Sequence, residues 1–144
     1  MIVYLNGRFL PKEDVRVSPD VRGFLLADGA YEVIRSYHGR LFKVTEHLTR
    51  LERSLRELRF TRPDVQRLGA VAEVLLQRND LDRGDAVLYI QVTRGVAPRT
   101  HAFPPPQTTP TVYLAASPFR SSPEKWEHGV SIILVPDIRW TRCD

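Results

Sequence analysis

Arg99 and His101 are the residues of this sequence whose types and spacing best suit binding chemistry. Gly95 and Pro98 interrupt the β-rich segment before them, and the prolines at 104–106 cannot continue a strand, so we predict an ordered, extended loop. Side chains two positions apart in an extended segment point the same way. An adjacent guanidinium and imidazole can bind a carboxylate, because Arg supplies a planar fork of donors and His adds another. An isolated pair also fits a plain solvated loop, so its context must decide.

Length and composition describe one globular domain. The chain has 144 residues, of which 42% are hydrophobic, enough for a core of ordinary size. No apolar run approaches the ~20 residues of a membrane span, and residues 1–6 resemble a strand rather than a signal peptide. Cys143 is the only cysteine, which excludes an internal disulfide and fits a reducing compartment. We expect a soluble cytoplasmic protein with no membrane contact and no metal site.

The charge pattern bears on nucleic-acid binding, because the formal net charge is +4. Three of the 21 cationic residues are lysines and the other 18 are arginines, spread along the chain and interleaved with acids, as in 50–59. This pattern is typical of a solvated helix face with ion pairs rather than of a surface that follows phosphates. A basic nucleic-acid-binding module is the weaker alternative, since it requires a one-sided arginine patch.

Two tight hairpins and two helices are predicted in the first part of the chain. Strands at 2–6 and 8–10 surround Asn6-Gly7, and strands at 33–37 and 40–43 surround His38-Gly39. A first helix is predicted to begin with Thr45 as its cap, and a second to open at Pro63 and to stop near Asn79. The residues expected to face inward are Leu48, Leu51, Leu55 and Leu58 in the first helix, and Val65, Leu68, Ala72, Leu75 and Leu76 in the second.

Three further strands are predicted at 86–94, 111–116 and 130–135. Strands with helices clustered between them indicate an α+β fold, with a mostly antiparallel sheet and two helices packed on it. The stretch Ser117 to Pro123 is the best candidate linker. We expect a small N-terminal domain over 1–117, and in 118–144 a linker and the first strand of a missing C-terminal cofactor-binding domain. The alternative is a natural tail in which the last strand and Trp140 fold back.

Four segments in the same order resemble the N-terminal half of the class IV (fold type IV) pyridoxal-phosphate-dependent aminotransferases. They are Asp28-Gly-Ala-Tyr-Glu-Val33, Glu46-His-Leu-x-Arg-Leu51, Val92-Thr-Arg-Gly95 and Asp137-Ile-Arg-Trp-x-Arg-Cys-Asp144. The loop Pro98-Arg-Thr-His101 most closely resembles that of the D-amino-acid aminotransferase branch. The resemblance covers essentially the whole chain, and it favours the functional interpretation of the arginine–histidine pair.

The resemblance implies roles for particular residues. Tyr31, Arg99 and His101 would bind the substrate carboxylate, and Arg50 would bind the phosphate of pyridoxal 5'-phosphate. Without the resemblance, we would interpret Tyr31 as a buried core tyrosine and Arg50 as one of several arginines on a helix surface. Glu32 should face opposite to Tyr31 in a strand, with a functional role and a structural ion pair both open. The remaining helix arginines at 53, 56 and 59 are expected on the surface, and His47 is expected to be structural.

The reactive lysine of such an enzyme is not found in the chain. Transamination with this cofactor needs a lysine for the Schiff base and for proton transfer. Lys12 lies in a predicted turn, Lys43 directly before a helix and Lys125 in the linker region, so none is placed for it. The resemblance puts the Schiff-base lysine beyond Asp144. We therefore expect the isolated chain to be inactive and not to bind the cofactor by itself.

The complete protein is then expected to transfer an amino group between a D-amino acid and a 2-oxo acid. The resemblance also implies a homodimer, in which the loop carrying Arg99 and His101 reaches the neighbouring subunit's site. Branched-chain aminotransfer and aminodeoxychorismate lyase chemistry are alternatives within the same fold. A non-catalytic stand-alone domain is an alternative from another functional class.

Overall fold

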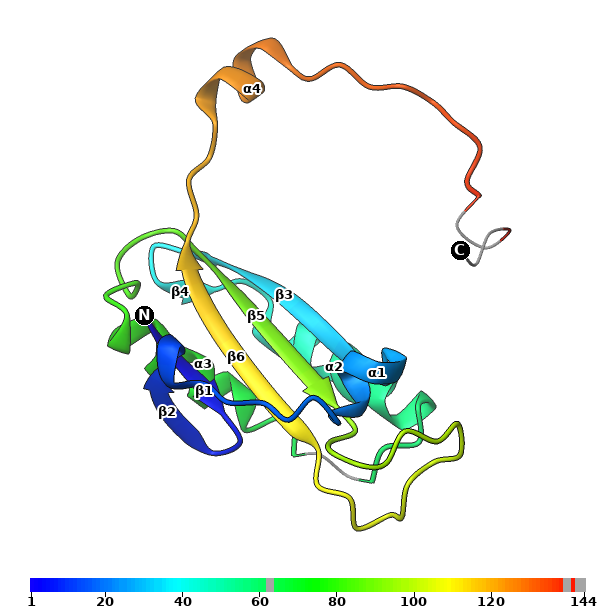
Figure 1. Ribbon diagram of the computed structural model, residues 1–144. Coiled ribbons are helices and arrows are strands. Elements are labelled where there is room, and N and C mark those ends of the chain that lie inside the picture. Colours follow the sequence, from blue (N-terminus) through cyan, green and yellow to red (C-terminus); the bar gives the residue numbers. More distant parts are fainter. Residues whose placement is uncertain (62–63, 139–140, 142–144) are drawn as a thin grey trace.

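The computed structural model describes residues 1–61, 64–138 and 141, and its main body is a six-stranded sheet (Figure 1). The strands are β1 (Ile2–Leu5), β2 (Arg8–Pro11), β3 (Gly29–Tyr37), β4 (Arg40–Leu41), β5 (Ala86–Thr93) and β6 (Thr111–Pro118). The helices are the 3-10 turn η1 (Lys12–Asp14), α1 (Arg22–Leu26), α2 (Val44–Glu57), α3 (Leu68–Arg78) and α4 (Pro123–His128). The strand order is β2-β1-β6-β5-β3-β4, with every neighbouring pair antiparallel. This confirms the predicted α+β class.

Both predicted hairpins are confirmed, and their turns explain why. Asn6 and Gly7 have φ of 47° and 91°, and His38 and Gly39 have φ of 48° and 79°. Positive φ at both central residues is what a type I′ turn requires, and this turn suits the twist of the strands that it joins. Gly39 is also needed for space, because a Cβ there would lie 1.8 Å from the carbonyl oxygen of Asp82.

Helices α2 and α3 pack on one face of the sheet and supply much of the core. Leu48, Leu51 and Leu55 of α2 are buried as predicted. Leu58, the fourth residue of the predicted stripe, is 38% exposed, because the helix ends at Glu57 before it can face the core. All five inward positions predicted for the second helix are buried: Val65, Leu68, Ala72, Leu75 and Leu76.

The helix starts differ from prediction. Helix α2 begins at Val44, so Thr45 lies inside it and makes no cap; its preceding residue, Lys43, has a left-handed φ of 51°. Helix α3 begins at Leu68, so the buried Val65 precedes it. The predicted start of the second helix, Pro63, lies outside the described residues. Apolar spacing thus predicts the buried face of each helix better than its first residue.

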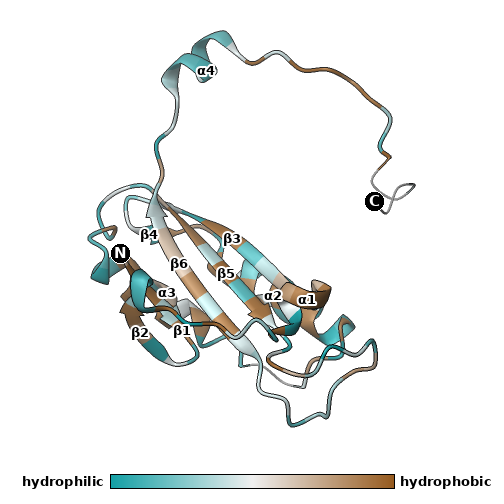
Figure 2. Ribbon diagram, viewed as in Figure 1, coloured by the Kyte–Doolittle hydropathy of each residue, from teal (hydrophilic) through white to brown (hydrophobic). Residues whose placement is uncertain are grey.

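The strand predicted at 130–135, as the first strand of a missing domain, is not formed in this chain. These residues form neither helix nor strand, and Ile132, Ile133 and Leu134 are highly exposed. A strand needs a neighbour for its backbone hydrogen bonds, and in the described part of the chain none lies beside this segment (Figure 1). In Figure 2 much of the ribbon of the tail beyond α4 is brown, the colour of hydrophobic residues.

The end of the main body lies close to the predicted domain boundary. Strand β6 continues to Pro118, two residues past its predicted end, and Lys125 lies in α4 rather than in an irregular linker. The division at 117/118 stays a prediction. Trp140 and Cys143 lie outside the described residues. Among the described residues, no helix is both long and apolar enough to cross a membrane.

Candidate functional site

The loop that joins β5 to β6 is ordered at its base, as the sequence predicts. Gly95 has φ of 101°, and a Cβ there would lie 2.0 Å from the carbonyl oxygen of Thr109. Only glycine lets the outgoing and returning backbone approach so closely. Val96 forms an isolated bridge with Val21, and Gly95 accepts a hydrogen bond of 2.8 Å from the amide of Arg22. The segment before α1 therefore anchors the outgoing arm of the loop.

Arg99 and His101 are both exposed on this loop. The amide of Thr100 donates to the carbonyl of Pro98 at 2.8 Å, which closes a three-residue turn around Arg99. The backbone also bends at His101, so the predicted extended backbone is wrong. The shared direction of the two side chains, which depended on it, stays a prediction. Within the described ranges, neither side chain makes an ion pair or a hydrogen bond, so both donors can serve a ligand.

Tyr31 lies on the face of the sheet opposite to the two large helices. Its side chain is 64% exposed, so it is not a core tyrosine. It pairs in register with Gln91, close to the sheet edge where β5 runs into the loop. Its ring makes a tilted contact with Tyr89, with 6.0 Å between ring centroids. The Tyr89 hydroxyl donates to Gln91 Oε1 at 2.5 Å, and burial followed by the nearby Tyr31 raises the pKa of Tyr89.

A hollow opens beside Tyr31 between α1 and the ends of β3 and β5. Its lining residues are Gly23, Phe24, Ala27, Gly29, Tyr31, Gln91 and Thr93. The lining is mostly apolar, with one phenol and one amide that could orient a small polar ligand.

Glu32 faces the other side of β3 and is 3% exposed, which confirms the predicted alternation with Tyr31. Its carboxylate accepts hydrogen bonds from Arg50 through Nε (2.6 Å to Oε1) and through Nη2, and from His47 Nδ1 (2.8 Å). Burial raises the pKa of Glu32, but the hydrogen bonds from Arg50 and His47 outweigh it, and the net pKa is lowered. Glu32 therefore has a structural partner, and His47 has the structural role predicted for it.

Arg50 is held by Glu32 but is not covered by it. The hydrogen bonding of Arg50 to Glu32 is the main cause of the raised pKa of Arg50, and the Arg50 side chain is 58% exposed. Two of its three nitrogens face the carboxylate, which leaves Nη1 available. A guanidinium fixed along one edge and open at the other fits a phosphate group. Arg53, Arg56 and Arg59 are exposed, as predicted.

The predicted site residues make no direct contact with one another among the described residues. No hydrogen bond, ion pair or ring contact joins any two of Tyr31, Arg50, Arg99 and His101 in the ranges that the structure describes. Tyr31 and the partner of Arg50 lie on opposite faces of β3. Tyr31 lies on β3, Arg50 on α2, and Arg99 and His101 on the loop between β5 and β6.

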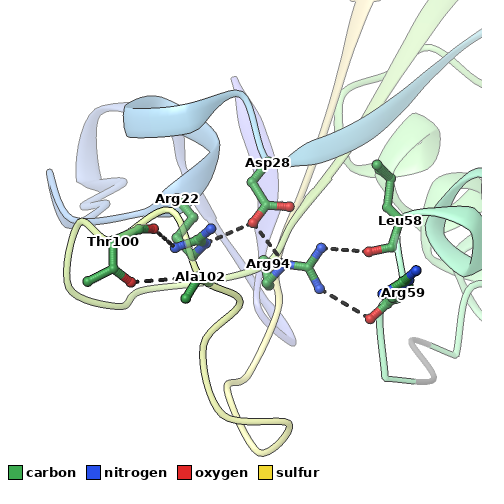
Figure 3. A network of polar contacts seen from close by, with 7 residues as sticks. All are labelled: Arg22, Asp28, Leu58, Arg59, Arg94, Thr100 and Ala102. Carbon is green, nitrogen blue, oxygen red and sulfur yellow. Dashed lines mark hydrogen bonds and ion pairs between the residues drawn. The ribbon is translucent and has the colours of Figure 1, made fainter.

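Sequence reasoning did not find the buried network that supports the loop (Figure 3). Asp28 Oδ2 accepts hydrogen bonds from Arg22 Nε (2.7 Å) and from Arg94 Nε (2.8 Å). Arg22 also donates to the carbonyl of Thr100 at 2.9 Å, and Arg94 donates to the carbonyls of Leu58 and Arg59. Burial raises the pKa of Asp28, but the hydrogen bonds from the two arginines outweigh it and lower the pKa overall.

Among the described residues, none of the three lysines contacts a predicted site residue. Lys12 is in η1, Lys43 directly precedes α2 and pairs at 3.8 Å with Glu46, and Lys125 is in α4. The predicted Schiff-base position beyond Asp144 lies outside the described residues.

Comparison with known proteins places these features in a family. The model of the family "Amino-transferase class IV" matches residues 29–143. A D-alanine aminotransferase of Staphylococcus haemolyticus is 41% identical over 143 residues, which are 99% of this chain and 50% of that protein. The chain thus spans about half the length of the curated relatives that it matches.

Solved structures agree on the fold. A hypothetical aminotransferase of Mycobacterium tuberculosis in its PLP-bound form superposes with a TM-score of 0.69 and 26% identity, over 82% of this chain and 39% of that one. A 4-amino-4-deoxychorismate lyase of Pseudomonas aeruginosa gives a TM-score of 0.67 and 32% identity, over 89% of this chain and 44% of that one. The sheet, the helices and the motif segments are therefore those of one family, and this chain belongs to the class IV aminotransferases.

Proposed function

We propose that this chain is the substrate-binding N-terminal part of a D-amino-acid aminotransferase that uses pyridoxal 5'-phosphate. The complete enzyme would transfer an amino group between a D-amino acid and a 2-oxo acid. The observation that carries the proposal is the 41% identity to a D-alanine aminotransferase over 99% of the chain. The side chains of Arg99 and His101 support it, because both are exposed and neither makes a hydrogen bond or ion pair within the described residues.

Each predicted site residue has chemistry that suits its proposed role. Arg99 would bind the substrate carboxylate through two parallel hydrogen bonds, and His101 would add a third donor. Tyr31 would donate its hydroxyl to the same carboxylate from the open face of the sheet. Fixing the carboxylate on one side decides which face of the substrate is presented for proton transfer, and this would select the D-enantiomer.

The cofactor fits the residues that this chain offers. Arg50 would hold the phosphate through the edge of its guanidinium that Glu32 leaves open. When bound, pyridoxal phosphate accepts the amino group from one substrate and passes it to the other. The proton-transferring lysine would come from outside this chain, so we propose that residues 1–144 alone are inactive. We also propose a cytoplasmic homodimer in which the Arg99 loop serves the neighbouring subunit.

A hybrid enzyme tests the proposed activity. Residues 1–144 would be joined to the C-terminal half of the S. haemolyticus D-alanine aminotransferase, which supplies the length that this chain does not cover. We expect amino transfer from D-alanine to 2-oxoglutarate, little from L-leucine, and no lyase activity on aminodeoxychorismate. The native relative serves as the control. A preference for L-leucine or for aminodeoxychorismate would overturn the D-amino-acid assignment.

The dimer is tested by sedimentation of the same hybrid. We expect a two-subunit species that retains activity. An active monomer would contradict the proposal that the loop serves a neighbouring subunit.

A further inference from the structure

Thr100 lies between the two proposed carboxylate-binding residues, and its backbone is fixed from both sides. Its amide donates to the Pro98 carbonyl at 2.8 Å, and its own carbonyl accepts from Arg22 Nη1 at 2.9 Å. The position of the Thr100 backbone therefore sets the positions from which the side chains of Arg99 and His101 leave the loop.

Arg22 is an unusual residue to hold a surface loop. It is 3% exposed, although it opens the short helix α1 and comes 78 positions before Thr100 in the sequence. Burying a guanidinium is costly unless its charge is balanced and its donors are bonded. Asp28 balances it at 2.7 Å, and the Thr100 carbonyl takes a second donor (Figure 3). The planar guanidinium of arginine can donate to Asp28 and to the Thr100 carbonyl at once, whereas the ammonium group of lysine has no such fixed arrangement of donors.

Arg94 uses the same oxygen of Asp28 but points elsewhere. It is 8% exposed, its guanidinium carbon lies 4.3 Å and 4.5 Å from the ring centroids of Phe60 and Phe103, and it donates to carbonyls at the end of α2. Two arginines therefore extend the network from one carboxylate. Arg22 connects Asp28 to the Thr100 carbonyl of the loop, and Arg94 connects it chiefly to the carbonyls at the end of α2.

We propose that Arg22, oriented by Asp28, is a positioning residue for substrate carboxylate binding. It touches no proposed substrate group itself and acts through the Thr100 peptide on Arg99 and His101. The inference rests on the proposed function, because it presumes that this pair binds a carboxylate. Loss of the Arg22 hydrogen bond to Thr100 would leave the donors present but misplaced, and small misplacements of binding groups have large kinetic effects.

The test is a double-mutant cycle in the hybrid enzyme, with Arg22→Lys, Arg99→Ala and both together. The lysine keeps the positive charge beside Asp28 but cannot bond both partners as the fork does. We expect Arg22→Lys to raise the KM for D-alanine about five- to tenfold, with kcat changed less than about twofold. In the Arg99→Ala background the same substitution should change KM less than about twofold, because the residue it positions is gone.

Arg94→Lys is the matched control. It has the same partner oxygen and similar burial, so it should lower thermal stability about as much as Arg22→Lys, with little change in KM. Hydrogen exchange in the 144-residue chain gives a second readout. The amides of 100–102 should exchange faster in Arg22→Lys, while those of β5 keep their protection.

The outcomes separate the two proposals. If Arg99→Ala leaves the KM for D-alanine unchanged, the proposed carboxylate site itself is wrong. If Arg99→Ala raises KM but Arg22→Lys does not, or if the two effects on KM simply multiply, only the positioning role of Arg22 is overturned. A KM increase in Arg94→Lys equal to that in Arg22→Lys would also overturn it, since a general loss of stability would then explain both.

Discussion

The guanidinium groups of Arg50 and Arg99 are held in place in two different ways. Arg50 is held through its side chain, because Nε and Nη2 both donate to the buried carboxylate of Glu32. Arg99 is held through its backbone, because the amide and the carbonyl of the next residue, Thr100, are both hydrogen-bonded, while the Arg99 guanidinium stays unpaired within the described residues. The first arrangement fixes the cation before any ligand arrives. The second keeps every donor of the cation for the ligand.

The difference fits the two ligands that we propose. A cofactor phosphate stays bound through many turnovers, so one open edge of a rigid guanidinium can serve it. A substrate carboxylate must be bound and released in each turnover, so a guanidinium with no other partner, on a supported loop, suits it. The carboxylates of the buried Glu32 and the half-buried Asp28 are thus comparable supports, one for the side chain of Arg50 and one for the loop that carries Arg99.

The largest effect is expected from removing the support of the loop. Asp28→Asn keeps the shape of the side chain but leaves Arg22 and Arg94 as buried cations without a counter-charge. Breaking a buried ion pair in this way costs about 3–5 kcal/mol of unfolding free energy. Urea unfolding of the 144-residue chain measures it, with the exposed Asp14→Asn as control. Equal stabilities of the two variants would show that the network does not support the fold.

A smaller loss is expected from removing the support of Arg50. Glu32→Gln keeps an acceptor for one donor but removes the charge, and hydrogen bonds to charged groups contribute about 1.5–3 kcal/mol. We expect about 2 kcal/mol lower unfolding free energy in the chain and weaker cofactor binding in the hybrid enzyme. Glu46→Gln, on the exposed surface of α2, should change neither. Unchanged cofactor affinity in Glu32→Gln would contradict the role of this carboxylate in orienting Arg50.

Acid should weaken both supports. The pKa values of Asp28 and Glu32 are lowered on folding from ordinary values of 3.8 and 4.5. As the pH falls through these values, the unfolded chain binds protons first, so the unfolding free energy decreases. We expect a decline that begins near pH 4.5, and a flatter profile in Asp28→Asn with Glu32→Gln. An equally steep decline in that double variant would assign the acid sensitivity to other carboxyl groups.

The parts of this molecule that could be predicted from sequence are those with local signals. Asn6-Gly7 and His38-Gly39 adopt the positive φ values that their tight turns require. The spacing of the leucines in α2 determines which face of that helix is buried. The alternation of Tyr31 and Glu32 also follows from the period of a strand. Segment 130–135 has a strand-like sequence but no neighbouring strand in the described chain, and a strand depends on that neighbour.

The support network could not be predicted because its contacts are distant in sequence. Arg22 meets Thr100 from 78 positions away, and Arg94 meets Asp28 from 66 positions away. No spacing rule links such residues, and each arginine alone is one of 18. Arg99 and His101 stand out through the prolines around them, but the bend that orients Arg99 is a product of the anchored backbone.

Carboxylate binding by the Arg99 loop is best tested by the KM of Arg99→Ala for D-alanine in the hybrid enzyme, with the exposed Arg53→Ala as control. Truncating a donor pair that binds a charged group should raise KM at least about tenfold. Because Arg99 is exposed and unpaired in the described chain, the unfolding free energy of residues 1–144 should change by less than about 0.5 kcal/mol. A KM equal to that of Arg53→Ala would contradict the proposal that this loop binds the substrate carboxylate.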